Sequence, residues 1–174
     1  MKVQQQVISP QDIVILLKIT TYINKPWSQL ALAEELVISQ SEVSKSLMRS
    51  KYASLLDHTG KKVMRMALME FLEYGIKYVF PQQPGAIVRG IPTAHSAPPL
   101  NAVFQSQEQY VWPSASGTVR GQSIQPLYPS VVQAVKYDEN LYELLALVDA
   151  IRVGRAREKE MAIEELKKRL LDGE

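Results

Sequence analysis

The sequence predicts a mainly helical protein in three parts: helical segments at residues 1–80 and 138–174, and a proline-rich extended arm at 81–137 between them. Proline marks the division, because eight of the ten prolines lie in the middle part, where they disfavour helix. The distribution of charge supports the same division into three parts. The three parts carry net charges of +3, +2 and −3, and the middle part holds only four charged side chains. The outer parts are rich in helix-forming residues, with apolar side chains at helical spacing.

Length and composition define the class of protein. A chain of 174 residues, 46% hydrophobic and 22% charged, can bury a core, which argues against a disordered tail. It has no apolar run long enough to span a bilayer and no signal-peptide pattern at its start, so we expect a cytoplasmic protein without membrane contact. The chain has no cysteine and only two histidines, His58 and His95, which excludes disulfides and argues against most metal sites.

Three short helices are predicted in a row near the amino terminus, each after a serine that can cap it. Ser9 precedes the first helix, and Asp12 stands where it can complete a capping box. Ser28 can cap a second helix, and Ser39 with Glu42 repeats the capping-box spacing at the start of a third. The predicted inward stripes consist of Leu30, Ala33, Leu36 and Val37 in the second helix and Val43 and Leu47 in the third.

The stretch SQLALAEELVISQSEVSKSL at residues 28–47 resembles the helix-turn-helix of bacterial transcription regulators. The pattern combines a small residue, an acidic residue, a tight turn and anchoring apolar side chains, at Ala31 or Ala33, Ile38, Ser39, Ser41, Val43, Ser44 and Leu47. The residues at 55–57, Leu-Leu-Asp, look like the end of a winged-helix core of the MarR-like type. The resemblance covers about residues 9–60. It implies a DNA-binding domain at residues 1–80 whose third helix, at about 40–50, enters the major groove.

The resemblance weakens after Asp57, where a winged helix continues into a two-stranded hairpin. The residues HTGKK suit a turn, but residues 63–79 carry apolar side chains at helical spacing. We therefore predict a short or absent wing, followed by a long buried helix over 63–79 in which Gly75 weakens the last turn.

The third helix and the basic residues after it form the predicted DNA contact. With Val43 and Leu47 turned inward, the opposite face presents polar side chains that can bond base edges or phosphates, with Met48 exposed among them. From Lys45 to Arg65 there are six basic residues and one acidic residue, a net charge of +5 over 21 residues. The predicted DNA-binding residues are Gln40, Ser41, Ser44, Lys45, Arg49, Lys51, Lys61 and Lys62. The alternative interpretation is a solvated face in an interaction module that keeps the fold without binding DNA.

The proline-rich arm contains the sequence Val-Arg-Gly twice, with Arg89 and Arg120 spaced 31 residues apart. Proline and glycine favour extended backbone and turns, and the apolar side chains of the arm favour packing over disorder. We therefore predict an ordered arm that lies against a partner or in a groove. Two roles are open for the two arginines, holding phosphates or bonding loop carbonyls.

His95, in the arm, is the one candidate for catalysis. A Ser-His hydrolase needs an acid to orient the histidine and a nucleophile within hydrogen-bond reach. The arm has a single acid, Glu108, and the chain has neither a Gly-x-Ser-x-Gly motif nor a nucleotide-binding glycine motif. We therefore predict that His95 serves loop packing and that the protein is not an enzyme and has no cofactor or metal.

The carboxyl-terminal segment is predicted to be helical, with a wide apolar stripe before Gly154 and a narrower one at Ile163, Leu166 and Leu170. The narrow stripe suits a homodimer or packing within one chain, and the resemblance implies dimers that read successive turns of DNA. The predicted function is sequence-specific transcriptional regulation, with double-stranded DNA as the partner. The alternative is a protein-interaction module, such as an antitoxin-like protein that holds a protein partner through the arm and the carboxyl-terminal helices.

Overall fold

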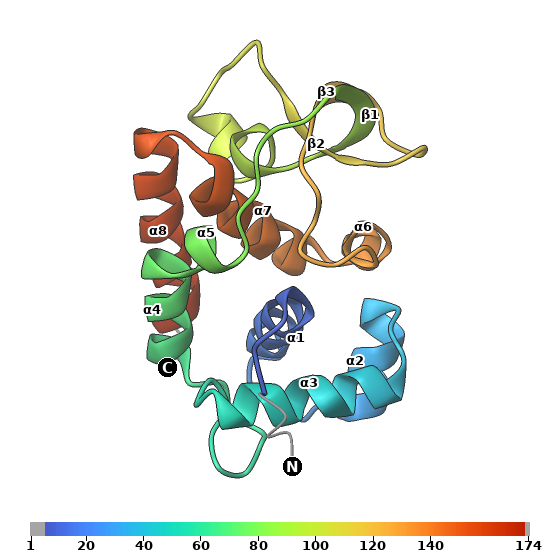
Figure 1. Cartoon of the computed structure of the whole chain (residues 1–174), viewed down its shortest axis with the longest axis vertical. Coiled ribbons are helices and arrows are strands. Elements are labelled where there is room, and N and C mark those ends of the chain that lie inside the picture. Colours follow the sequence, from blue (N-terminus) through green and yellow to red (C-terminus); the bar gives the residue numbers. More distant parts are fainter. Residues whose placement is uncertain (1–5, 173–174) are drawn as a thin grey trace, which may run out of the picture.

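The computed structural model describes residues 6–172 and confirms a mainly helical chain (Figure 1). The helices are α1 (Pro10–Thr20), α2 (Gln29–Leu36), α3 (Gln40–Tyr52), α4 (Arg65–Tyr74), α5 (Ile76–Val79), α6 (Val131–Ala134), α7 (Glu139–Val153) and α8 (Ala156–Leu171). The strands are β1 (Ile87–Pro92), β2 (Tyr110–Pro113) and β3 (Val119–Ser123), with short 3-10 turns η1 (Ala94–Ser96), η2 (Leu100–Ala102) and η3 (Val135–Tyr137). Within the described residues, no helix combines the length and the apolar character needed to cross a membrane.

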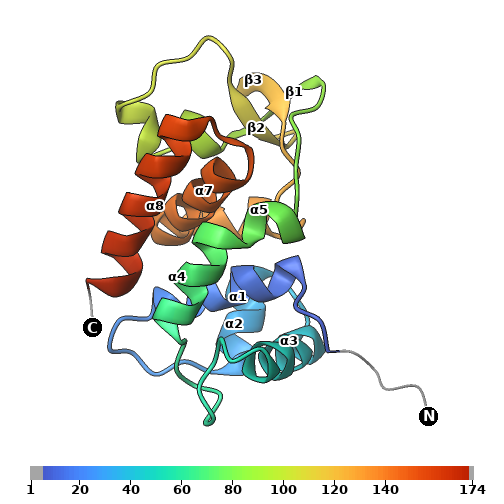
Figure 2. The ribbon, with the colours of Figure 1, turned by 60° about the vertical axis from the view of Figure 1, so that its left-hand side comes forward.

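Helix α1 occupies the centre of the molecule. Every residue from Gln11 to Thr20 is buried, because the helix is apolar nearly all around and lies between α3 and α7 (Figures 1 and 2). Helix α4 packs against α8, and buried apolar side chains from all three parts of the sequence join a single cluster. The predicted boundaries after residues 80 and 137 therefore do not separate independent hydrophobic cores.

The capping signals are confirmed at the first three helices. The Asp12 carboxylate accepts the backbone N–H of Ser9 at 2.8 Å, which completes the start of α1. The Ser28 hydroxyl caps α2. At the start of α3, Ser39 and Glu42 form a reciprocal capping box, with hydrogen bonds of 3.2 and 3.3 Å. Local spacing therefore fixes where each of these helices begins.

The inward face of α2 differs from the prediction. Ala33 and Leu36 are buried as predicted, but Leu30 and Val37 are exposed, and Leu32 is buried in their place. Val37 lies outside the helix, because α2 ends at Leu36 and Val37 adopts left-handed backbone geometry with φ 56°. This conformation is strained for a β-branched residue, and it provides the tight turn that leads into α3.

The prediction of one continuous helix over 63–79 is wrong. Helix α4 ends at Tyr74 and α5 begins at Ile76, with Gly75 between them. Glycine weakens a helix, and a Cβ at this position would meet the Phe71 ring at 3.0 Å. Leu68, Leu72 and Ile76 are buried at the predicted spacing, but Met64 and Val79, which the same spacing turns inward, are exposed.

The proline-rich arm is ordered, as predicted, but it forms a small sheet that the sequence did not predict. Strand β1 pairs in antiparallel fashion with both β2 and β3, while β2 and β3 meet in parallel, so the three strands close on one another. The two Val-Arg-Gly segments are partners in this sheet, with Arg89 directly opposite Arg120.

A buried carboxylate fixes the arm to α7. Asp149 of α7 accepts hydrogen bonds from the Thr93 hydroxyl and from Nε1 of Trp112, each at 2.7 Å, and forms an ion pair with Arg152 at 3.0 Å. Trp112 itself is almost fully buried. Because buried polar groups are stable only with partners, these contacts hold the arm against the helices instead of leaving it extended in solvent.

The last helix uses its apolar stripe inside the chain. Leu166 and Leu170 of α8 are fully buried, and α8 contacts both α7 and α4 (Figure 2). The stripe therefore packs within the chain, which is one of the two roles that the sequence left open for it. Homodimerisation through another surface stays a prediction.

Candidate nucleic-acid interface

Helices α2 and α3, joined by the turn at 37–39, lie at one end of the molecule (Figure 1). Val43 and Leu47 of α3 are buried as predicted, and α3 packs against both α1 and α2. Two neighbouring helices thus support one side of α3. The opposite side is left facing solvent along the length of the helix.

The solvent face of α3 carries a row of four exposed side chains. Ser41, Lys45, Met48 and Tyr52 follow one another at intervals of four, three and four residues, which places them on one line along the helix. Met48 is 60% exposed and Tyr52 is 73% exposed. The row combines a hydroxyl, an ammonium group, a thioether and an aromatic ring, so it can meet both polar and apolar groups of a partner.

The predicted site residues lie along α3 and on the turn that follows it. Six of them are exposed: Gln40, Ser41, Lys45, Lys51, Lys61 and Lys62. The other two, Ser44 and Arg49, are half-buried. The six exposed residues give this end of the molecule a polar, cationic surface.

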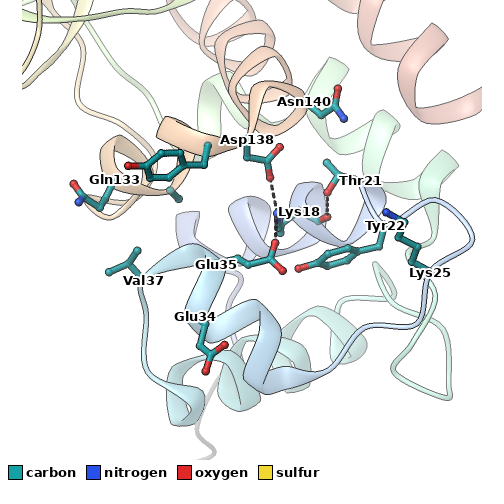
Figure 3. A pocket seen from close by; sticks show the side chains of 12 residues that line it. Lys18, Thr21, Tyr22, Lys25, Glu34, Glu35, Val37, Gln133, Asp138 and Asn140 are labelled. Carbon is teal, nitrogen blue, oxygen red and sulfur yellow. Dashed lines mark hydrogen bonds and ion pairs between the residues drawn. The ribbon is translucent and has the colours of Figure 1, made fainter.

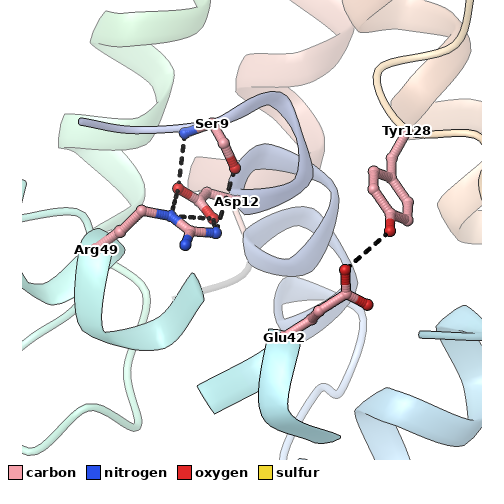
Figure 4. A network of polar contacts seen from close by, with 5 residues as sticks. All are labelled: Ser9, Asp12, Glu42, Arg49 and Tyr128. Carbon is pink, nitrogen blue, oxygen red and sulfur yellow. Dashed lines mark hydrogen bonds and ion pairs between the residues drawn. The ribbon is translucent and has the colours of Figure 1, made fainter. Parts of the chain in front are cut away.

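Arg49, which the sequence predicts as a DNA contact, is engaged inside the protein (Figure 4). Its guanidinium donates to both oxygens of the fully buried Asp12 carboxylate at 2.7–3.2 Å, and its Nη2 lies 3.3 Å from the Ser9 hydroxyl. These hydrogen bonds raise the pKa of Arg49 above its ordinary value, against the opposing effect of burial. Arg49 therefore joins α3 to the start of α1, and the spacing of α3 alone could not reveal this partner.

The turn at 57–62 stands at the position where a winged helix has its wing. Leu56 and Val63 form one antiparallel β-bridge at its base, so the hairpin is short, as predicted. Inside the turn, the Asp57 carboxylate accepts the backbone N–H groups of Lys62 and Lys61 and the hydroxyl of Thr59 at 2.8–3.1 Å. The Lys62 N–H and the Thr59 hydroxyl contribute most to lowering the pKa of Asp57 to about 2. The turn is held in one shape by its own carboxylate.

The aromatic ring of Trp27 connects this turn to the loop between α1 and α2. The Lys61 ammonium lies 4.5 Å from the centre of the ring, and Nε1 of Trp27 donates to the Lys61 carbonyl at 3.3 Å. A cation over the face of an indole is attracted by the ring electrons. Trp27 therefore positions Lys61 on the surface of the turn.

The exposed lysines of this surface have no acidic partner among the described residues. Within the described part of the chain, Lys45, Lys51, Lys61 and Lys62 form no ion pair, whereas the lysines and arginines of α8 that face α4 and α7 do. Asp57 lies between them in sequence, but its oxygens are occupied by the turn. The surface is thus suited to an anionic partner.

A second contact fixes the other end of α3 (Figure 4). The Tyr128 hydroxyl, from the segment between β3 and α6, donates to the Glu42 carboxylate at 3.3 Å. Burial, with the nearby charge of Glu42, raises the pKa of Tyr128, which keeps its hydroxyl protonated as a donor. With Glu42 near its start and Arg49 near its end, α3 is tied to the rest of the chain at two points.

A cleft of about 570 Å³ lies between α1 and α2 on one side and the segment of α6, η3 and α7 on the other (Figure 3). At its base, the Lys18 ammonium lies 2.5 Å from both Glu35 of α2 and Asp138 at the start of α7. Burial acts to lower the pKa of Lys18, but the hydrogen bonds to these two carboxylates outweigh it and raise the pKa. The ammonium group of Lys18 therefore stays charged and connects α1 to α2 and to the start of α7.

His95 lies away from this surface in a packed loop of the arm. Its Nε2 is 2.8 Å from the Glu108 carbonyl, and its ring meets the Tyr110 ring edge to face with centres 4.7 Å apart. The neighbouring Ser96 hydroxyl accepts the Tyr110 backbone N–H at 2.9 Å. Through these contacts, His95 and Ser96 pack the loop of the arm. Among residues 6–172, no group of three or more His, Asp or Glu side chains is arranged to hold a metal ion.

The chain was compared with models of protein families, with curated proteins and with solved structures, and none of the three comparisons found a match.

Sequence reasoning missed three residues that shape the surface. Tyr52 continues the exposed row of α3, and its spacing of four from Met48 is a signal that could have identified it. Trp27 and Tyr128 hold Lys61 and Glu42 from distant positions in the chain. No spacing rule connects those pairs.

Proposed function

We propose that this protein binds double-stranded DNA and regulates transcription, with α3 placed in the major groove. The single observation that carries the proposal is the row of Ser41, Lys45, Met48 and Tyr52 on the exposed face of a helix whose other face is supported by α1 and α2. A helix held in this way can enter the major groove, which is wide enough to admit one.

The charge of the surface supports the same proposal. Lysines lie on α3 and on the adjoining turn, and they have no ion pair among the described residues. DNA presents closely spaced phosphates, and cations that neutralise them release counterions from the duplex. Lys45 and Lys51 on the helix and Lys61 and Lys62 on the turn would then contact backbone phosphates on either side of the groove.

A salt titration tests this proposal. Binding of a labelled duplex is measured by fluorescence anisotropy for the wild type and for the double variant Lys45→Gln and Lys62→Gln. Each lost phosphate contact lowers the slope of log K against log salt by about 0.9, so we expect the double variant to lose about 1.8. Lys77→Gln on α5, away from α3 (Figure 1), is the matched control and should keep the wild-type slope. An unchanged slope in a folded double variant would remove α3 and the turn from the interface.

Sequence specificity is expected to depend on the first turn of α3. Gln40 is exposed there, and a glutamine amide can bond two atoms of adenine in the major groove. Gln40→Ala should therefore relax the preference at one base position by about 1–3 kcal/mol in selection from random duplexes. If the wild type itself returns no motif, the protein binds DNA without the specificity that regulation requires.

The alternative of a protein-interaction module is favoured by a different surface from the one predicted. The arm and α8 are largely packed within the chain, but α4 and α5 expose Met66, Tyr74 and Tyr78, spaced eight and four residues apart. These exposed apolar side chains would form the binding surface of such a module, and we propose a second copy of this chain as the partner that covers them. Light scattering should report a dimer that Tyr74→Ser with Tyr78→Ser converts to a monomer. A monomeric wild type would exclude the dimer.

A further inference from the structure

The two Val-Arg-Gly segments place two positive charges together on the sheet. Arg89 of β1 and Arg120 of β3 stand directly opposite each other in an antiparallel pair. Side chains in this relation point to the same face, with Cβ atoms about 4.5–5.5 Å apart, and like charges there repel. Both side chains are exposed, and neither has a hydrogen bond or an ion pair from its guanidinium within residues 6–172.

Among residues 6–172, no acidic side chain forms an ion pair with either of these arginines. The one acid of residues 81–137 is Glu108, and its carboxylate lies 3.5 Å from Arg155 of the loop before α8. The sequence left open whether the two arginines bond loop carbonyls. Among the described residues, neither guanidinium group makes such a hydrogen bond. The guanidinium donors of Arg89 and Arg120 are therefore available to a ligand.

The turn beside Arg89 adds further donors. The backbone N–H of Ser114 donates to the Arg89 carbonyl at 3.1 Å, which holds the turn at 114–117 against β1. The hydroxyl groups of Ser114 and Ser116 lie 3.0 Å apart in this turn. The two guanidinium groups and a turn with two serine hydroxyls are thus carried by neighbouring segments of the sheet, and all of these groups can donate hydrogen bonds to an oxyanion.

We propose that Arg89 and Arg120 bind the phosphate group of a small phosphorylated ligand. Guanidinium groups bind phosphate through paired, charge-assisted hydrogen bonds, and an anion between them replaces repulsion by attraction. The sheet and α3 lie at opposite ends of the long axis of the molecule (Figure 1), so a straight duplex on α3 does not reach this pair. The ligand proposed here is therefore separate from a duplex bound at α3. This site does not depend on DNA binding by α3.

Thermal unfolding with inorganic phosphate as the probe tests the site, with chloride at equal ionic strength as the reference. At ten times its Kd, a bound ligand stabilises the fold by about 1.4 kcal/mol, which corresponds to a rise in Tm of about 3–6 °C. We expect this rise in the wild type and its loss in both Arg89→Gln and Arg120→Gln. The matched control is Arg157→Gln, an exposed arginine of α8, which should keep the rise.

The reference measurements separate binding from a structural role. In chloride, Arg89→Gln should unfold at or above the wild-type Tm, because the substitution removes a repulsion. A lower Tm there would show that the arginine stabilises the fold directly and would overturn the proposal. An equal rise in Tm with phosphate in the wild type and in all three single variants would also overturn the proposal. So would the absence of a rise in the wild type. If Arg89→Gln with Arg120→Gln weakened duplex binding as much as Lys45→Gln, the anion would be the DNA backbone and the assignment to a free ligand would be wrong.

Discussion

Substitution of Arg49 by alanine is expected to destabilise the fold rather than to remove a DNA contact. Asp12 is fully buried, and removing the partner of a buried charge costs about 3–5 kcal/mol because the charge is left uncompensated. The Arg49 side chain is 24% exposed, and the Ser9 N–H still donates to Asp12 at 2.8 Å. We therefore place the loss at the lower limit of the range, at about 3 kcal/mol.

Urea unfolding measures this loss. With an m-value of about 2 kcal/mol/M, a loss of about 3 kcal/mol lowers the unfolding midpoint by about 1.5 M at unchanged m. Lys45→Ala, one turn earlier on the exposed face, is the matched control and should stay within about 0.5 kcal/mol of the wild type. In an Asp12→Asn background, Arg49→Ala should cost much less, because no buried charge remains unpaired. A loss below about 1 kcal/mol for Arg49→Ala alone would refute the reasoning.

Three further predictions concern other parts of the fold. The pKa of Asp57 is lowered to about 2, so the ionised carboxylate stabilises the folded state above pH 4, and this stabilisation is lost as the pH falls toward 2. The difference in unfolding midpoint between the wild type and Asp57→Asn should therefore close over that pH range. Trp112→Phe removes the donor to Asp149 and should cost about 1–3 kcal/mol in urea unfolding, and a neutral effect would show that this hydrogen bond does not hold the arm. Lys18→Met leaves two carboxylates facing each other and should cost about 2–3 kcal/mol, whereas Lys25→Met, an exposed lysine in the same cleft, should be near neutral; equal effects would contradict a bridging role.

Local features of the fold could be predicted from the sequence because their partners lie within a helical turn. Ser9 with Asp12, and Ser39 with Glu42, are three residues apart, and both capping boxes are present. The helical period also predicted that Val43 is buried. Such features depend only on spacing, which the sequence displays directly.

Features that depend on distant partners could not be predicted. Arg49 has the charge and spacing of a DNA contact, and only the position of Asp12, 37 residues earlier, reveals its structural role. The sequence displays the repeat of Val-Arg-Gly, but it does not display the strand register that pairs Arg89 with Arg120. That register depends on the path of the chain between the two strands. Gly75 marks a weak point in the sequence, but helical spacing alone does not show that α4 ends at Tyr74 and that α5 begins at Ile76.

The internal role of Arg49 changes how α3 would read DNA. Arginine bonds guanine through two atoms, whereas lysine acts as a point charge, and the exposed cations of α3 are Lys45 and Lys51. Affinity would then come from lysines on the helix and the turn, while base discrimination would fall to the amide of Gln40. Because α3 is also tied at both ends, through Glu42 and Arg49, the helix would enter the groove as a rigid element. The expected source of specificity therefore lies in the first turn of α3 and not at its carboxyl end.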